Sequence, residues 1–357
     1  MKFYNYLLII IFVLSGGIVC AQDFQSVNFG DDFLSIGGGA RALGMGSAHA
    51  AFTDDVTAAF WNVGGLAAVE DIEVTYMHSE RFSGVVNFDY GAIAIPVSNK
   101  NANSVVAFTV FRQGVDGIKN TLDAFDSDLG QPRPDPTRFF TEFSARDFAF
   151  FLSYSTEVTE KISWGASAKL LNSKIGPFAN AWGYSLDLGV MVRGNFLNMG
   201  LNLQNITGLR KFWDTNPENL QQLATTFQDE IPEGQNEKTP PTVKFGLSKD
   251  FKVNDFSVLI AADSDFRFEG REAFYISTGN ISIEPHIGSE VTYKDLVSLR
   301  SGITNFAKDF DSNITVSPTF GAGLYFSSLS IDYGFSNFSG VSSELGNTHR
   351  ISILFGF

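Results

Sequence analysis

Stretches in which apolar side chains alternate with small or polar ones run through most of this 357-residue chain, and they constrain its fold more than any other feature. The clearest is SLDLGVMVR at residues 185–193, and SIDYGFS at 330–336 and RISILFGF at 350–357 repeat the pattern. A period of two places the apolar side chains on one face of a β-strand. The stretches continue for about 10 to 13 residues, whereas soluble strands usually have about five or six and tilted strands that cross a bilayer need about 9 to 11. The alternation therefore predicts an all-β protein with strands long enough to span a membrane.

Fourteen such stretches can be delimited, and fourteen satisfies the rule that single-chain bacterial barrels have an even number of strands. The connections at 159–161 and 294–295 are short, whereas those at 116–145 and 208–240 are long and polar. Short turns at one end and long extracellular loops at the other are typical of outer-membrane barrels. The sequence thus predicts a transmembrane antiparallel β-barrel over residues 70–357. Its expected strands are 70–79, 87–97, 104–115, 146–157, 162–176, 181–195, 197–207, 241–250, 256–267, 281–293, 296–306, 315–327, 329–338 and 349–357.

The composition agrees with a barrel in the cell outer membrane. Phe occurs 36 times and Gly 34 times, and aromatic side chains form the interface girdles of membrane barrels. The mean hydropathy is near zero, because lumen-facing and lipid-facing side chains average out along each strand. The chain ends on an alternating strand with Phe357, which resembles the signal that outer-membrane assembly machinery reads. We therefore expect outer-membrane lipid as a partner of the outer wall.

Residues 1–21 have the pattern of a secretory signal peptide. Lys2 precedes a short apolar run, and the small-residue ending Val19-Cys20-Ala21 resembles a cleavage site. The run is too short to span a bilayer as a helix. Lipidation of Cys20 is the weaker interpretation, because Val19 is bulky where a small residue normally precedes a lipidated cysteine.

Charge and histidine placement argue against several classes of function. Loss of Lys2 with the signal changes the formal net charge from −14 to −15, which argues against nucleic acid as a partner because phosphate binding needs clustered bases. His49, His78, His286 and His349 are scattered and have no cysteine partner in the mature chain, so no metal site is expected. GGGARA at 37–42 fits a dinucleotide fingerprint but lacks the preceding strand and the βαβ unit. We expect no cofactor, no catalytic residues and no enzyme activity.

The segment before the first strand carries the most specific motif. It reads GARALGMG at 39–46, DD at 54–55 and WNVGGLA at 61–67. This resembles the start of the PorV/PorQ family of outer-membrane proteins, which is related to the FadL-type fatty-acid transporters. Val63-Gly64 replaces the usual Pro-Ala pair. EVTY at 290–293 and LRSG at 299–302 resemble a strand-turn-strand near the end of the same family.

The resemblance implies a fourteen-stranded barrel whose N-terminal segment, residues 22–69, folds into the lumen as a plug. A barrel of this size is too wide for its own wall side chains to fill, and small residues allow a segment to pack closely against the inner wall. Arg41, Asp54 and Asp55 would then be luminal charges with partners on the wall. The plug residues expected to matter are Arg41, Gly44, Gly46, Asp54, Asp55, Trp61 and Asn62.

Two functions remain open at this stage. The first is FadL-like passage or binding of hydrophobic small molecules. The second is a non-transporting barrel that acts as a partner or shuttle in type IX secretion, in contact with the secretion machinery or with secreted proteins. Exposed aromatics in the long segments, such as Phe139-Phe140 and Phe212-Trp213, suit either a ligand or a protein partner.

Overall fold

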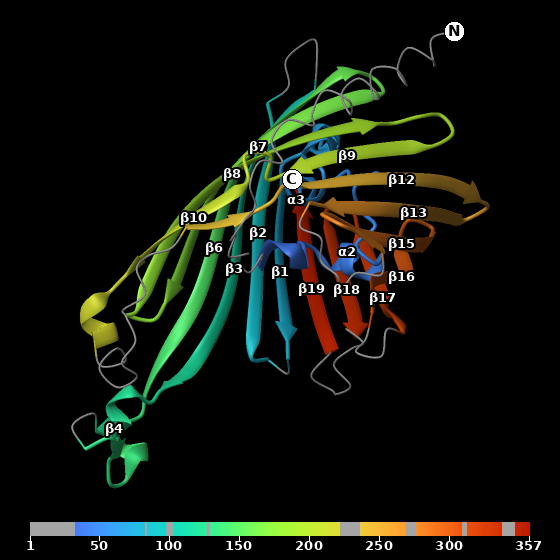
Figure 1. Cartoon of the computed structure of the whole chain (residues 1–357). Coiled ribbons are helices and arrows are strands. Elements are labelled where there is room, and N and C mark those ends of the chain that lie inside the picture. The colour runs from blue at the N-terminus through green and yellow to red at the C-terminus, as the bar shows by residue number, and fades with distance from the viewer. Residues whose placement is uncertain are drawn as a thin grey trace.

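Hydrogen bonds join fourteen antiparallel strands edge to edge until the last strand pairs with the first, which closes a barrel (Figure 1). The computed structural model describes residues 33–82, 84–97, 103–126, 129–221, 236–268, 276–308, 313–337 and 347–357. The expected signal peptide lies outside this range. The wall strands are β1 Glu73–Arg81, β2 Val86–Pro96, β3 Ser104–Asn120, β6 Thr141–Thr159, β7 Ile162–Ile175, β8 Ala179–Val192, β9 Asn198–Gln204, β12 Thr242–Val253, β13 Phe256–Arg267, β15 Ile281–Tyr293, β16 Val297–Lys308, β17 Ile314–Phe326, β18 Leu329–Asn337 and β19 Asn347–Gly356. All fourteen expected stretches are strands, and the predicted fold class is confirmed.

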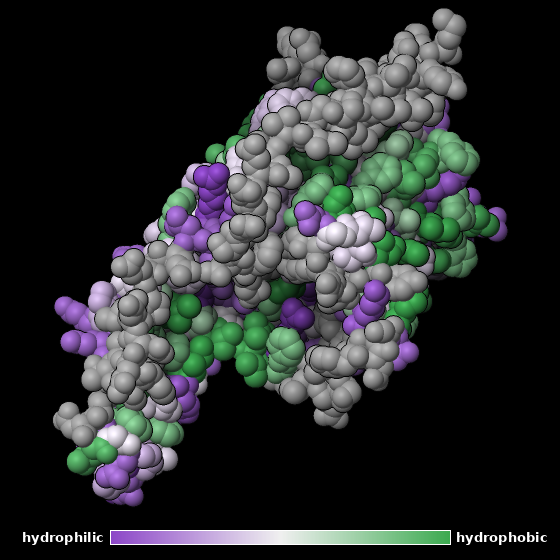
Figure 2. Space-filling view, in the orientation of Figure 1, coloured by the Kyte–Doolittle hydropathy of each residue, from purple (hydrophilic) through white to green (hydrophobic). Residues whose placement is uncertain are grey.

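Alternation along each strand separates an outward face from a luminal face. In β8, the side chains of Trp182, Tyr184 and Leu186 are exposed, whereas Ser185 and Asp187 between and beyond them are buried. The outward faces of β12, β13 and β15 carry mainly hydrophobic side chains (Figure 2). Because apolar side chains on an outer wall and polar ones inside are the reverse of a soluble barrel, this arrangement suits a hydrocarbon surrounding.

The two ends of the barrel differ in the length of their connections. At one end, two-residue and three-residue turns join β6 to β7, β12 to β13 and β15 to β16, and Asn254, Lys294 and Asp295 adopt the left-handed conformation that such tight turns need. At the other end, β3 and β6 extend beyond the rest of the barrel and carry a small tip (Figure 1). The tip contains η3 Leu122–Ala124, β4 Phe125–Asp126, β5 Gln131–Pro132 and η4 Pro136–Phe139. We call these the turn end and the loop end.

The expected loop at 208–240 is wrong in part, because strand pairing resumes inside it. β10 Leu209–Thr215 pairs with β8, and β11 Asn236–Thr239 pairs with β10. β10 continues β9 after a four-residue interruption in which Asn205 and Gly208 have positive φ. Pro240 and Pro241 separate β11 from β12, and neither can donate a backbone hydrogen bond to a ladder. A short strand, β14 Ile276–Thr278, also pairs with β15.

Residues 33–69, which precede β1, lie inside the barrel. They contain η1 Phe33–Ile36, α2 Ala40–Gly44, α3 Ala58–Trp61 and η2 Val63–Ala68, which lie among the strands (Figure 1). Most of these residues are buried. We call residues 33–69 the plug; the boundaries expected for the three parts of the chain, 1–21, 22–69 and 70–357, stay a prediction.

No helix in the described parts of the chain combines the length and the apolar character needed to cross a membrane.

Candidate functional site

Eight glycines on the luminal wall form a belt against which the backbone of the plug lies. They occur as four cross-strand pairs: Gly165 with Gly189, Gly200 with Gly246, Gly288 with Gly302, and Gly321 with Gly334. A methyl group added at any of the eight would meet plug atoms, in most cases backbone atoms. We call these residues the glycine belt. Close backbone approach of this kind is possible only where the side chain is absent.

The plug follows the belt around the barrel in the order of its own sequence. Ala40 contacts Gly334, Gly44 contacts Gly321, and Ala50 contacts Gly200. At the far end, Gly64 lies against Gly189. Gly46 shows why small residues are needed on both sides: its φ is +64°, and a Cβ there would lie 2.7 Å from the carbonyl oxygen of Ile287. The plug and the wall therefore pack closely because both have small residues where their backbones meet.

On the β15–β18 side, a buried ion network holds the first helix of the plug. The guanidinium group of Arg41 donates two hydrogen bonds to Glu290, at 2.8 and 3.0 Å. Glu290 also accepts from Arg300, and Arg300 donates to Asp332 at 2.7 Å. Glu290, Arg300 and Asp332 are all buried. Breaking a buried pair of this kind by removing one partner costs about 3–5 kcal/mol, so this network fixes α2 strongly.

Polar side chains of β12, β13 and β15 bind the middle of the plug. One carboxylate oxygen of Asp263 accepts from the backbone N–H groups of both His49 and Ala50, each at 2.7 Å. The imidazole Nδ1 of His286 lies 3.0 Å from the carbonyl oxygen of Gly46. Burial, followed by the charge of Arg41, lowers the pKa of His49 well below its usual value. His49 is therefore neutral at pH 7.

Asp265, Glu284 and His286 lie close enough together to raise the question of a metal site. Lys244 already binds Asp265, and Arg267 lies 3.5 Å from Glu284. Two fixed cations satisfy these carboxylates, which leaves them poor ligands for a further cation. The cluster is consistent with a structural ion network.

The β2–β6 side of the lumen carries aromatic side chains that contact the other parts of the plug. Beyond it, β7 and β8 carry the buried ion pair of Lys169 and Asp187, at 2.6 Å. Phe60 of α3 stacks on Phe111 at 6.1 Å and on Phe151 at 6.2 Å between ring centroids. Phe33 of η1 lies 5.9 Å from Phe111. The lumen thus has an ionic half, which binds residues 40–50, and an aromatic half, which packs against Phe33 and Phe60.

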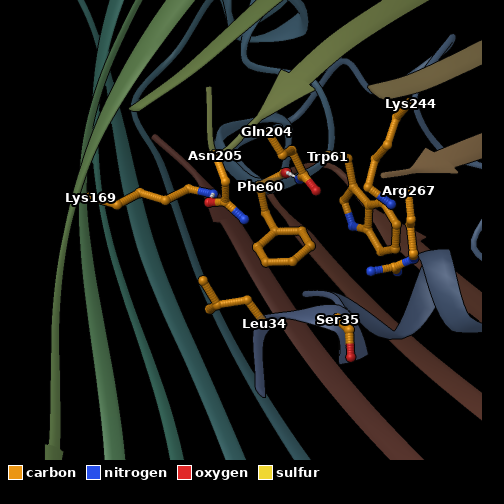
Figure 3. Close-up of a pocket in the computed structure, with 9 residues that line it drawn as sticks. All are labelled: Leu34, Ser35, Phe60, Trp61, Lys169, Gln204, Asn205, Lys244 and Arg267. Carbon is orange, nitrogen blue, oxygen red and sulfur yellow. Dashed lines mark hydrogen bonds between the residues drawn. The ribbon is translucent and has the colours of Figure 1, made fainter. Parts of the chain in front are cut away.

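A small cavity lies where the two halves meet, on the loop-end side of the glycine belt (Figure 3). Phe60 and Trp61 project into it between Lys169 on one side and Lys244 and Arg267 on the other. The cavity has a volume of about 20 Å³, which is enough for one water-sized group. It has no room for an organic molecule while the plug is in this position. The remaining lining residues are Leu34, Ser35, Gln204 and Asn205.

The residues expected in the plug from the sequence all lie in the lumen, but only some reach the wall. Arg41 binds Glu290 of the wall, whereas Asp54 lies 3.6 Å from Arg41 and Asp55 accepts from the backbone N–H of Thr57, both within the plug. Among the described residues, the ion pair of Asp54 and the hydrogen bonds of Asp55 are thus made within the plug, whereas Arg193, which follows β8, acts on Asp54 through its charge. The expectation of wall partners for the two carboxylates stays a prediction.

Trp61 and Asn62 hold the plug together and join it to β8. The indole N–H of Trp61 donates to the carbonyl of Gly38 at 2.7 Å. The Asn62 amide donates to Ala50 at 2.8 Å within the plug and to Val190 of the wall at 3.1 Å. Whether any of these residues is needed for a function stays a prediction.

Sequence reasoning missed the wall partners. Glu290 and Arg300 were noted only for a family resemblance, and Asp263 and Asp332 were not connected with the plug. Their position in the two-residue alternation could have identified them, because each occupies a luminal position in a strand whose outward positions are mainly apolar. Charges and glycines at such positions mark places where the wall binds something other than lipid.

Several solved structures share this fold. The Pseudomonas putida toluene transporter TodX matches with a TM-score of 0.56 and 14% identity, over 89% of this chain and 96% of that one. The Ralstonia pickettii toluene transporter TbuX matches with a TM-score of 0.53 and 14% identity, over 90% and 98%. The monoaromatic hydrocarbon channel CymD matches with a TM-score of 0.54 and 13% identity, over 90% and 98%. At such identities the likeness establishes the fold.

No family model matches the chain, and no curated protein sequence matches it. The structural neighbours named above are transporters or channels, and a Pseudomonas aeruginosa FadL homologue is among the further matches, with a TM-score of 0.50. The chain therefore has a FadL-like barrel fold. Membership of the PorV/PorQ family stays a hypothesis that rests on the sequence motifs.

Proposed function

We propose that this protein is an outer-membrane channel through which hydrophobic small molecules enter the cell. The observation that carries the proposal is a closed barrel with an apolar outer wall whose lumen holds a fitted plug with one aromatic face. Structural neighbours that transport toluene or form monoaromatic hydrocarbon channels support it. Residues 1–21 would direct export, and residues 22–69 would form the plug domain.

Passage in this proposal requires the plug to separate from the aromatic half of the lumen. Separation from the ionic half would break the buried contact of Glu290 with Arg41, at a cost of about 3–5 kcal/mol. Separation of Phe60 from Phe111 and Phe151 breaks no ion pair among the described residues, although the hydrogen bond from Gln204 to the carbonyl oxygen of Phe60 opposes it. A hydrophobic molecule that enters the gap covers the exposed aromatic surface again. The path therefore lies beside Phe60, next to the cavity.

Uptake of radiolabelled toluene by whole Gram-negative cells tests this proposal. Cells that express the full chain should take up toluene faster than cells with an empty vector. Phe60→Ala should raise the rate further, because removal of the ring enlarges the cavity between the plug and the aromatic half. Phe320→Ala is the matched control, since it removes a ring of the same size from the outward face of β17, where Phe320 is 54% exposed.

Localisation is measured in the same cells. The protein should fractionate with the outer membrane and migrate faster in gels before heating than after it. A correctly folded outer-membrane barrel that gives no toluene uptake above the empty vector would contradict the channel, and recovery of the protein as a soluble periplasmic species would contradict the membrane location.

The type IX secretion role makes a different prediction. The exposed rings of Phe139 and Phe140 at the loop-end tip would then contact a protein, and their replacement by Ser would reduce secretion without a change in toluene uptake. Among the residues that the structure describes, no luminal contact favours this role, so we propose the channel first.

A further inference from the structure

The outward face of β6, β7 and β8 carries an unusual pair of bases near the loop end. Arg146 of β6 and Lys174 of β7 are directly opposite each other in the strand register. Both point away from the lumen, because their neighbours Asp147 and Ser173 face inward, where they form a hydrogen bond with each other. The side chain of Arg146 is 50% exposed, and Lys174 is exposed as well.

Two like charges in directly opposite positions destabilise a sheet, since the Cβ atoms of such a pair are only about 4.5–5.5 Å apart. Arg146 is partly compensated, because one of its terminal nitrogens binds Asp116 at 3.1 Å. Asp116 also lies 3.9 Å from Arg112. Within the described part of the chain, the ammonium group of Lys174 has no hydrogen bond or ion pair. The next outward residue along the row is the neutral Asn180 of β8. Asp214 of β10 follows Asn180 in the same row, so the row as a whole is nearly neutral. Among the described residues, Lys174 nevertheless keeps an unpaired positive charge directly beside Arg146.

Aromatic side chains lie directly below this pair, on the side of the turn end. Phe148 of β6 is two residues below Arg146, and Trp182 of β8 and Phe212 of β10 are paired across the next level. Trp182 is 50% exposed and Phe212 is 44% exposed on the outward face. Outward aromatics of this kind occupy the level of the lipid headgroups in membrane barrels. Arg146 and Lys174 thus lie at the height where headgroup phosphates are found.

We propose that Arg146 and Lys174 bind the phosphate group of an outer-leaflet lipid, with the acyl chains of that lipid packed over Phe148 and Trp182. This inference rests on the proposed membrane location. The free N–H groups of Arg146 and the three ammonium donors of Lys174 can bind phosphate oxygens together, and a phosphate between them removes their mutual repulsion. The amides of Asn172 and Asn180, which are hydrogen-bonded to each other at 3.0 Å, border the site. The aromatic row favours a lipid over a free phosphate ion, because a dissolved ion gains nothing from apolar surface.

Binding of bis-phosphorylated lipid A to the full-length protein in detergent tests the proposal. The double variant Arg146→Gln/Lys174→Gln should bind lipid A about ten-fold or more weakly than the wild type, since it loses two charge-assisted contacts. The matched control Lys249→Gln/Lys294→Gln removes two bases near the turn end, and it should bind as the wild type does. An uncharged glycolipid should bind the wild type and the double variant equally.

Three results would overturn the proposal. The first is that the two double variants bind lipid A with equal affinity, and the second is that inorganic phosphate at an equal phosphate concentration displaces lipid A. The third is that the wild type binds lipid A and the uncharged glycolipid with equal affinity. Heat-dependent gel migration verifies that each variant is folded. Toluene uptake by the Arg146→Gln/Lys174→Gln cells should equal that of the wild type, because neither residue faces the lumen. Failure of the lipid site therefore leaves the channel proposal intact, and failure of toluene uptake leaves the lipid measurement interpretable.

Discussion

Replacement of a single belt glycine by alanine should displace the plug while the wall stays folded. In Gly302→Ala, the new methyl group would lie no farther than 2.8 Å from three backbone atoms of Met45 and Gly46. Ordinary contacts between carbon atoms begin at about 3.5 Å, so the plug backbone has to move back by roughly 0.7 to 1 Å. A shift of this size also breaks the 3.0 Å contact between the carbonyl of Gly46 and His286.

The magnitude follows from these two effects. Overpacking of a close-packed interior costs about 1–3 kcal/mol, and loss of one buried hydrogen bond costs about 0.5–1.5 kcal/mol. We therefore expect Gly302→Ala to weaken plug binding by about 1.5–4.5 kcal/mol. Gly91→Ala is the matched control, because the nearest atom to its added methyl group lies 4.0 Å away. Alanine is better than glycine inside a strand by about 0.5–1 kcal/mol, so the control should be neutral or slightly stabilised.

Limited proteolysis at increasing urea concentrations measures release of the plug, and heat-dependent gel migration measures the wall. Gly302→Ala should expose residues 33–69 to cleavage at a lower urea concentration than the wild type, with an intact wall. Planar-bilayer conductance should rise in the same variant, because the lumen opens. Equal protection of the plug in Gly302→Ala and Gly91→Ala would refute the argument that paired glycines determine the fit.

Three further variants examine individual contacts of the plug. Glu290→Gln removes the charge that binds two arginines, so the free energy of plug binding should fall by about 3–5 kcal/mol and the plug should become sensitive to protease. Protease sensitivity equal to that of the wild type would contradict the role of the buried ion network. Trp61→Phe keeps an aromatic ring of smaller size but leaves the carbonyl of Gly38 without its donor, and urea titration should show that plug binding weakens by about 1–3 kcal/mol from the lost hydrogen bond. The third variant concerns pH. Burial lowers the pKa of His49 in the folded plug, so the unfolded plug binds a proton more readily. The stability of the bound plug is therefore fully present above about pH 6.5 and decreases as the pH falls, by up to about 1.4 kcal/mol per pH unit. His49→Asn should reduce this slope, and an unchanged slope would show that other groups cause it.

The barrel was predictable because its signal is repeated. A period of two over about ten residues appears fourteen times, and each repeat constrains the next, since neighbouring strands must pair. The small residues of the plug were also predictable as a site of close packing. Their counterparts on the wall were not connected with them, because the register between Gly46 and Gly302 depends on how 14 strands are staggered around the barrel. A sequence pattern read one strand at a time does not contain that stagger.

The strands inside the expected loop at 208–240 were missed for a local reason. Residues 205–208 interrupt the alternation, and Asn205 and Gly208 have the positive φ that normally marks a turn. The chain nevertheless continues in the same direction, so that β10 resumes pairing with β8. Trp213 and Asp214 were therefore assigned to a loop although they belong to the wall.

The positions of the glycine belt in the sequence have a consequence for how the protein is made. The plug precedes every wall strand, yet the glycines that it contacts extend from Gly165 to Gly334. Its binding surface does not exist until the later half of the chain has been synthesised and arranged as a sheet. The plug therefore cannot reach its bound conformation before the strands up to β18, which carries Gly334, have formed. Because these contacts join residues far apart in the sequence, docking of the plug belongs to the slow, long-range part of folding.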